Sequence, residues 1–312
     1  MIARLQQSLS PELFGGLMIL SSMAILGLSD NIFYYLEPYM GLGQFHALRS
    51  SVCLLLLVPF AYVTGAKLLP YNWKPVMART ILLSAAMFLY FGSLPIMSVA
   101  EAAAGLFTSP IFVLIFTNVF YKERIGIRRI LAVAIGTIGV LFVLRPDQSG
   151  FNILQTMPIA AGALYALASI TTRRWCADEP PLSLVANFFL VLGLAGALAT
   201  TILEFRPVSE GLFEMAPFFF RGWMAIDSVT IGWGIVQGFM TLIAIALLTR
   251  GYQVAETSYM AVFEYSLLIF AALWTFVLFG KALAFTSIIG FVLIAGSGVI
   301  VSRALPSKQE TS

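Results

Sequence analysis

The tripeptide Val-Ala-Glu occurs twice, at 99–101 and again at 254–256, and each copy opens a long apolar stretch. Each stretch has one interruption, Ser-Pro at 109–110 in the first copy and Glu-Tyr at 264–265 in the second. A charged turn and a glycine-bearing apolar stretch follow both copies. The chain therefore consists of two similar hydrophobic halves, which is typical of membrane proteins built from internal repeats.

The composition places most of this chain in lipid. Hydrophobic residues make up 60% of it and charged residues 11%. A soluble domain needs roughly a quarter of its residues charged, so lipid must be part of the solvent here. Cys53 and Cys176 lie in different segments without metal-ligand spacing, and we expect neither a metal site nor a cofactor.

The apolar runs predict how often the chain crosses the membrane, because a helix needs about twenty apolar residues to span the hydrocarbon. They indicate an all-α polytopic membrane protein. Its ten transmembrane helices are expected at 12–35, 44–65, 76–96, 98–120, 127–145, 153–173, 182–203, 230–250, 256–279 and 284–302. The polar opening segment does not look like a cleavable signal peptide, so we expect the first run to be a mature span. We interpret the long aromatic connection at 204–229 as an interfacial segment.

Five of these spans fall in each half of the chain. Residues 1–146 are expected to form the first repeat and residues 152–306 the second, followed by a polar tail at 307–312. Because five is an odd number, the second half must enter the bilayer in the opposite direction from the first. The sequence therefore predicts an inverted five-helix repeat with a pseudo-two-fold axis in the membrane plane.

The distribution of Lys and Arg orients this fold. The side of the termini is expected to carry Arg4, Lys67, Lys74, Arg79, Lys122, Arg124, Arg128, Arg129, Arg173, Arg174, Arg250, Arg303 and Lys308. The other side is expected to carry Arg145, Arg206, Arg221 and Lys281, and Arg49 is left inside a span. Since cytoplasmic loops carry the excess of basic residues, both termini are expected to be cytoplasmic.

Polar groups within the spans are the strongest functional signal, because they are costly at membrane depth. Asp30 and Asn31 lie in the outer part of the first span, and Arg49 lies in the outer part of the second. The topology puts them at similar depth, so an Asp30–Arg49 pair is expected. The pair is either a structural ion pair or a direct contact with a substrate.

The two interruptions provide a second set of candidates. Glu264 lies near the middle of the ninth span and has no cation in its own helix. An unpaired carboxylate at that depth tends to hold a proton, so Glu264 is the proton-coupling candidate. Ser109 occupies the matching place in the fourth span, where Pro110 removes a backbone donor. Free carbonyls and a hydroxyl beside a cavity can bind a polar solute.

Other polar residues have structural interpretations. Glu101 and Glu256 begin the fourth and ninth spans, where an acid favours the positive end of the helix dipole, so we interpret both as helix caps. His46 is the single histidine and is expected to be a satisfied interfacial side chain. Glycine pairs such as Gly234 and Gly238 are expected to let helices pack closely.

The later part of each half has a recognisable pattern. The first copy reads SVAEAAAGLFTSPIFVLIFTNVFYKERIGIRRILAVAIGTIGVLFVLRP, and the second reads AVFEYSLLIFAALWTFVLFGKALAFTSIIGFVLIAGSGVIV. These runs resemble the drug/metabolite transporter superfamily, in particular its ten-span EamA-like bacterial branch. Two departures stand out: Lys281 replaces the usual Glu after the ninth span, and 264–265 replace a usual proline.

The resemblance implies transport of a small organic solute by alternating access, without ATP. Amino acids and their derivatives, vitamins such as riboflavin, and nucleotide-like solutes such as S-adenosylmethionine are moved by members of the family, in either direction. Toxic cations are moved as well.

We therefore expect a secondary active transporter of the bacterial inner membrane that binds a small-molecule solute between its halves. The expected substrate-binding residues supply charge, hydrogen bonds and aromatic walls: Asp30, Asn31, Arg49, Tyr90, Ser109, Trp233, Glu264 and Tyr265. A passive pore or membrane scaffold is the alternative. An integral-membrane enzyme is a weaker one, because the sequence has no H-E-x-x-H, no Ser–Lys or Cys–His arrangement and no P-loop. We expect the lipid bilayer but no nucleic acid as a partner, and a monomer or homodimer.

Overall fold

The computed structural model describes residues 10–33, 35–93, 102, 105–144, 156–280 and 285–303. Over these ranges the chain forms helices and turns and no strand, which confirms the all-α fold. The longer helices are α2 (Pro11–Phe33), α3 (Leu42–Thr64), α4 (Trp73–Ser93), α6 (Ser109–Tyr121), α7 (Ile127–Leu144), α8 (Met157–Trp175), α9 (Pro181–Phe205), α12 (Ser228–Val254), α14 (Ser266–Phe279) and α15 (Phe285–Arg303). The shorter ones are η1 (Glu37–Tyr39), α10 (Glu210–Met215), α11 (Pro217–Phe220) and α13 (Thr257–Phe263).

Six segments of the described chain are long and apolar enough to cross a membrane: α2, α3, α4, α9, α12 and the combined stretch 257–278. Large apolar side chains face outward, and Tyr62 and Val63 on α3 are 89% and 82% exposed. Such a surface is stable when lipid covers it. The chain is therefore a multi-pass membrane protein, and the ten-span inverted repeat stays a prediction.

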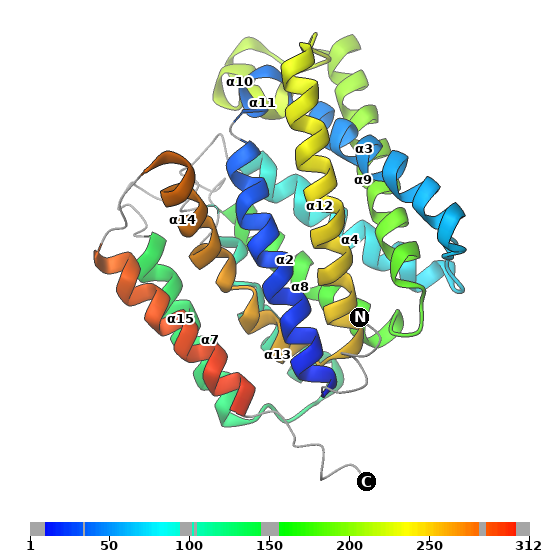
Figure 1. Cartoon of the computed structure of the whole chain (residues 1–312). Coiled ribbons are helices and arrows are strands. Elements are labelled where there is room, and N and C mark those ends of the chain that lie inside the picture. The colour runs from blue at the N-terminus through cyan, green and yellow to red at the C-terminus, as the bar shows by residue number, and fades with distance from the viewer. Residues whose placement is uncertain are drawn as a thin grey trace.

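The two halves of the sequence interleave in space. The most extensive helix contacts join α2 to α12, α3 to α9, α4 to α8 and α7 to α15. Each of these pairs takes one helix from the first half of the chain and one from the second. Figure 1 shows α7 and α15 side by side at one edge of the molecule, and α3 and α9 together at the opposite edge. The interior between these edges is thus walled by both halves.

Glycines allow the closest of these helix approaches. A Cβ added at Gly43 on α3 would lie 2.5 Å from the carbonyl oxygen of Gly196 on α9. On α12, a Cβ at Gly234 or Gly238 would come within 2.7 Å or 2.8 Å of an α3 side chain. The packing interpretation of these α12 glycines is therefore confirmed.

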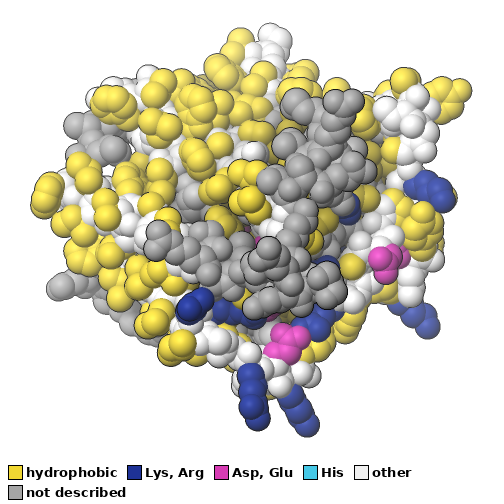
Figure 2. All heavy atoms as spheres, turned by 60° about the horizontal axis from the view of Figure 1, so that its bottom comes forward, with side chains coloured by type: hydrophobic (Ala, Val, Ile, Leu, Met, Phe, Trp, Pro, Cys, Tyr) yellow, Lys and Arg dark blue, Asp and Glu magenta, His cyan; other side chains and the backbone are white. Residues whose placement is uncertain are grey.

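The two ends of the bundle differ in character. We call the end at which α2 begins and α15 ends the lower end, and the end that carries α10 and α11 the upper end (Figure 1). Figure 2 looks onto the lower end, where Lys and Arg side chains gather while hydrophobic side chains cover the flanks. At the upper end, Arg221 Nη1 donates to the carbonyl oxygen of Glu37 at 3.1 Å and so ties the 204–229 connection to the bundle.

Two basic side chains are buried within the bundle. His46 is completely buried near the start of α3, where its Nδ1 lies 3.0 Å from Arg49 Nη2. Arg79, expected on the cytoplasmic face, is 3% exposed inside the bundle. Its side chain reaches hydroxyl and carbonyl acceptors on neighbouring helices, and these acceptors replace the water that a surface position would have supplied.

Adding a methyl group between α3 and α9 tests the glycine contact. We expect Gly43→Ala to lower the free energy of unfolding by about 1–3 kcal/mol, because the methyl group meets a backbone carbonyl that cannot move freely. Gly232→Ala on α12 is the control, since nothing lies within 4 Å of its added Cβ. Thermal unfolding of the purified protein measures both, and an equal effect of the two substitutions would contradict this packing.

Asp227 caps α12 just outside the membrane-spanning part of that helix. Its Oδ1 accepts a hydrogen bond from the backbone N of Thr230 at 2.8 Å. Hydrogen bonds from Thr230 lower the pKa of Asp227 below its ordinary value of 3.8. A lowered folded-state pKa means that the carboxylate stabilises the fold above the unfolded-state pKa and loses this contribution as the pH falls through the folded-state pKa.

The cap predicts a pH-dependent effect of substitution. At pH 7 we expect Asp227→Ala to lower the unfolding temperature, and this difference from the wild type should shrink below about pH 4. Asp227→Asn keeps a capping side chain without a charge, so it should stay closer to the wild type. Unfolding temperatures measured from pH 3 to 7 test this, and a constant Ala effect over that range would contradict it.

Candidate functional site

Two interior helices are broken where the sequence marks an interruption. α6 begins at Ser109, directly after a turn at 107–108. α13 and α14 are separated by a turn at 264–265, which confirms the interruption that the sequence indicates there. Irregular backbone at membrane depth is tolerated where it is buried in protein or lines a cavity.

Both breaks reach one interior cavity of about 100 Å³. Its walls come from α2, α3, α4, α6, α8, α9, α12 and the α13–α14 turn, so both halves of the chain contribute. Most of the lining is apolar. Its polar and ionisable members are Ser29, Asp30, Arg49, Tyr90, Ser109, Tyr165, Gln237, Thr241 and Glu264. A mostly apolar pocket with a few converging polar groups is the usual form of a small-molecule site.

Asp30 and Arg49 face this cavity together, but they do not form the direct ion pair that their depth suggested. The Arg49 guanidinium lies over the rings of Phe45 and Phe91, 4.8 Å and 5.1 Å from their centroids. Its Nη2 lies 3.0 Å from Nδ1 of His46. Ring faces and an imidazole therefore hold the cation, and the Asp30 carboxyl stays on the cavity wall.

Glu264 is 4% exposed and accepts a hydrogen bond of 2.5 Å from the Tyr165 hydroxyl on α8. Tyr252 on α12 lies beside the same carboxyl group. No Lys, Arg or His of the described ranges forms an ion pair with Glu264, which agrees with the sequence analysis. A buried carboxyl group whose neighbours are neutral hydroxyls can gain or lose a proton without breaking an ion pair.

Three of the expected site residues lie away from the cavity. Asn31 accepts a hydrogen bond from Thr275 Oγ1 at 3.1 Å and so joins α2 to α14. The Tyr265 hydroxyl lies 3.0 Å from Thr137 Oγ1 and packs against α7. Trp233 is on the outer surface, where it stacks on an exposed tyrosine with ring centroids 5.1 Å apart. The other five, which are Asp30, Arg49, Tyr90, Ser109 and Glu264, line the cavity.

The cavity also contains polar residues that the sequence analysis did not select. Ser29 and Thr241 lie 3.3 Å apart through their hydroxyl oxygens and join α2 to α12. Gln237 precedes a packing glycine on α12, and Tyr165 is one aromatic residue among many. All four are uncharged, so an analysis that selects charged residues within the predicted spans does not find them. In the described ranges, no group of three or more His, Cys, Asp or Glu side chains gathers as metal ligands would.

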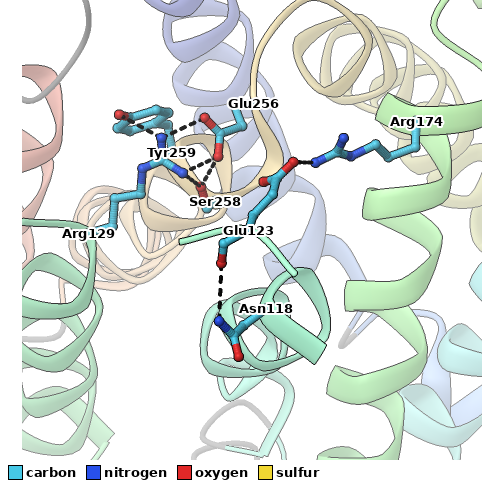
Figure 3. A network of polar contacts seen from close by, with 7 residues as sticks. All are labelled: Asn118, Glu123, Arg129, Arg174, Glu256, Ser258 and Tyr259. Carbon is cyan, nitrogen blue, oxygen red and sulfur yellow. Dashed lines mark hydrogen bonds and ion pairs between the residues drawn. The ribbon is translucent and has the colours of Figure 1, made fainter. Parts of the chain in front are cut away.

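A separate polar hollow of about 640 Å³ opens at the lower end. Figure 3 shows the ion pairs in it: Arg129 of α7 binds Glu256 through both of its Nη atoms, and Arg174 of α8 binds Glu123. Arg129 also donates to the Tyr259 hydroxyl at 3.0 Å and lies over that ring. Each ion pair joins a residue of the first half of the chain to one of the second.

Glu256 therefore has a different role from the one expected. It occupies the N-cap position of α13, but its side chain does not cap the helix. The carboxylate turns to Arg129 and to the Ser258 hydroxyl instead, because a cation is a stronger partner than a backbone N–H. Glu101, the other expected cap, lies outside the described residues.

Comparisons with known proteins agree with this architecture. A solved crystal structure superposes with a TM-score of 0.75 at 17% identity, covering 97% of this chain and 99% of that one, which shows the fold alone. A riboflavin transporter of Rhizobium johnstonii is 24% identical over 233 residues, which is 75% of this chain and 71% of that protein. A pseudopaline exporter of Pseudomonas aeruginosa is 22% identical over 256 residues, which is 82% of this chain and 84% of that protein.

The family comparison gives the most specific result. Residues 13–145, which run from the first turn of α2 to the end of α7 and include parts of four of the cavity's helices, match the EamA-like transporter family. Relatives that are named as transporters match over 75% and 82% of this chain. The resemblance that the sequence indicates is thus confirmed over residues 13–145, which match the EamA-like transporter family and make up less than half of the chain.

Proposed function

We propose that this protein is a secondary active transporter that moves a small organic metabolite across the bacterial inner membrane by alternating access. The solute binds in the cavity between the halves, and both termini are cytoplasmic. The observation that carries the proposal is the meeting of two broken helices, at Ser109 and at Glu264, on one interior cavity that Asp30 and Arg49 also face. Discontinuous helices around a mid-membrane site are the usual construction of secondary transporters.

The pattern of helix pairing supports an inverted repeat of ten spans. When the first five spans are exchanged with the second five, the pair α2–α12 becomes the pair α8–α4, and both are extensive contacts. The pairs α3–α9 and α7–α15 map onto themselves under the same exchange. A pseudo-two-fold arrangement requires this correspondence, and rocking of one half against the other follows naturally from it.

The cavity chemistry favours a solute with both apolar and charged parts. Two carboxyl groups, Asp30 and Glu264, and one guanidinium, Arg49, lie on a wall that is otherwise largely apolar. Such a wall suits an amino acid, an amino acid derivative, or a flat heterocycle such as a vitamin or nucleotide-like solute. The named relatives include a riboflavin transporter and a pseudopaline exporter, which fit this range.

The two ion pairs of the lower end are the proposed closure on that side. They join the halves across the polar hollow and lie partly exposed to solvent, so water can replace each pair at modest cost. A contact of this kind can form in one state and open in the other. The basic surface around it supports a cytoplasmic location for this end.

Ligand binding and counterflow test the proposal. The purified protein is screened by thermal unfolding against amino acids, vitamins and nucleosides, since a solute that binds the folded state raises the unfolding temperature. The best solute is then tested in proteoliposomes. A carrier predicts that preloaded solute accelerates uptake of labelled solute. Uptake that preloading does not accelerate would favour a pore, and the absence of any uptake would favour a scaffold.

Glu264 provides the test of proton coupling. If its carboxyl group carries the coupled proton, Glu264→Gln should abolish the dependence of uptake on an imposed pH gradient while exchange of solute for solute continues. The matched control is Glu210→Gln on α10, an exposed carboxylate outside the cavity. Labelled uptake into proteoliposomes with and without a pH gradient measures this. An unchanged pH response in Glu264→Gln would remove the residue from this role.

Charge reversal tests the lower closure. We expect Arg129→Glu to slow transport roughly tenfold, which corresponds to about 1.4 kcal/mol lost from the closed state. Arg129→Glu combined with Glu256→Arg should recover much of the rate, because the pair is restored with opposite polarity. Arg128→Glu, an exposed neighbour that changes the net charge equally, is the control. Failure of the double variant to exceed the single one would contradict a role for this pair.

A further inference from the structure

Arg79 is a buried cation that has no acidic partner among the described residues. It lies on α4, 3% exposed, and it donates to three neutral oxygens on three other helices. The acceptors are Thr172 Oγ1 at 3.2 Å, the Leu184 carbonyl oxygen at 3.0 Å and Thr249 Oγ1 at 3.2 Å. None of the described Asp or Glu side chains forms an ion pair with it. Since a buried charge is normally paired, its positive charge is left for something else to balance.

The guanidinium faces a small chamber of about 40 Å³. The polar and ionisable wall residues of this chamber all carry hydrogen-bond donors: Arg79, Tyr165, Ser169, Thr172, Thr249 and Tyr252. Among the described residues, no carboxylate lines the chamber, and the remaining wall residues are apolar. Tyr165 and Thr172 already donate to Glu264 and to the Ala168 carbonyl oxygen. Arg79 with the hydroxyls of Ser169, Thr249 and Tyr252 is the remaining donor set, and a cation among hydroxyls recognises an oxyanion. The volume holds about three water molecules or one carboxylate or phosphate group.

The Tyr252 hydroxyl is a further donor on the chamber wall. It is buried on α12 at 3% exposure of the residue and lies within reach of the Glu264 carboxyl group and of Ser169. Because a hydroxyl hydrogen can rotate, Tyr252 can turn its donor toward an anion in the chamber.

The chamber continues the main cavity. The two spaces share Met87, Tyr165, Phe188, Ile245 and Leu248 in their walls. Tyr165 stands at the junction, with its hydroxyl donating to Glu264. A solute whose acidic group enters the chamber would leave the rest of its body in the main cavity, beside Asp30 and Glu264.

We infer that Arg79 and the surrounding hydroxyls form an oxyanion subsite that receives the carboxylate or phosphate group of the transported solute. This inference rests on the proposed function for the identity of the ligand, but the subsite can be tested alone with a simple ion. The subsite would orient the bound solute, with its anionic end at Arg79 on α4 and its apolar or cationic part beside Asp30 and Glu264.

Thermal unfolding with small anions tests the subsite. In the wild type, sodium formate or inorganic phosphate should raise the unfolding temperature saturably beyond sodium chloride at equal ionic strength. Arg79→Lys keeps the charge but loses the planar fork, and we expect its apparent dissociation constant for formate to rise about fivefold or more. Tyr252→Phe should weaken formate binding several-fold while removing no packing. Tyr62→Phe, on the exposed surface of α3, should match the wild type.

The outcomes separate the subsite from the transporter proposal. A formate shift that is absent from the wild type, or unchanged in both Arg79→Lys and Tyr252→Phe, would overturn the subsite whatever the protein transports. If formate also competes with the solute found in the binding screen, the subsite receives that solute's acidic group. Additive, non-competitive effects would overturn the assignment to the solute and indicate a free anion instead. An anion effect without solute transport would reject the transporter and keep the subsite.

Discussion

Every backbone N–H and C=O at membrane depth must find a partner within the protein, and this constraint decides where the chain can do chemistry. Regular helices meet it by themselves. The turns before Ser109 and at Glu264 do not, so they can exist only where protein or a lined cavity surrounds them. The fold brings both turns to one interior space, where α2, α4, α8 and α12 supply the walls. The helix breaks therefore lie at the cavity because irregular backbone is tolerated there.

The protein stabilises its charges differently at different depths. Near the lower end, Arg129 and Glu256 form an ordinary ion pair that water can reach. Deep in the bundle, Arg49 rests on aromatic faces, Arg79 on hydroxyls and carbonyls, and Glu264 on a tyrosine. Neutral partners leave each deep charge available to a solute or a proton. Paired charges would cancel one another and offer less to a ligand.

Much of this could be predicted from the sequence, for identifiable reasons. Apolar length predicts the helices, and a polar pair within an apolar run predicts the break at 264–265. The rotation of each helix could not be predicted, because α2, α12 and α14 are apolar on nearly all sides and show no single buried face. For this reason Asn31 and Tyr265 were expected on the cavity wall but lie in helix contacts instead. Arg79 on α4 was assigned to the side of the termini, and nothing in the sequence indicated that it would be buried within the bundle.

The central claim is that the cavity opens to each side of the membrane in turn, and thiol labelling at Ser109 tests it most directly. Cys53 and Cys176 are both free and buried, so a background without them can be made before Ser109→Cys is introduced. A membrane-impermeant thiol reagent is then added to one or the other side of sealed vesicles. The account predicts labelling from each side while the membrane stays impermeable to the reagent. Labelling from neither side, or from one side alone, would contradict it.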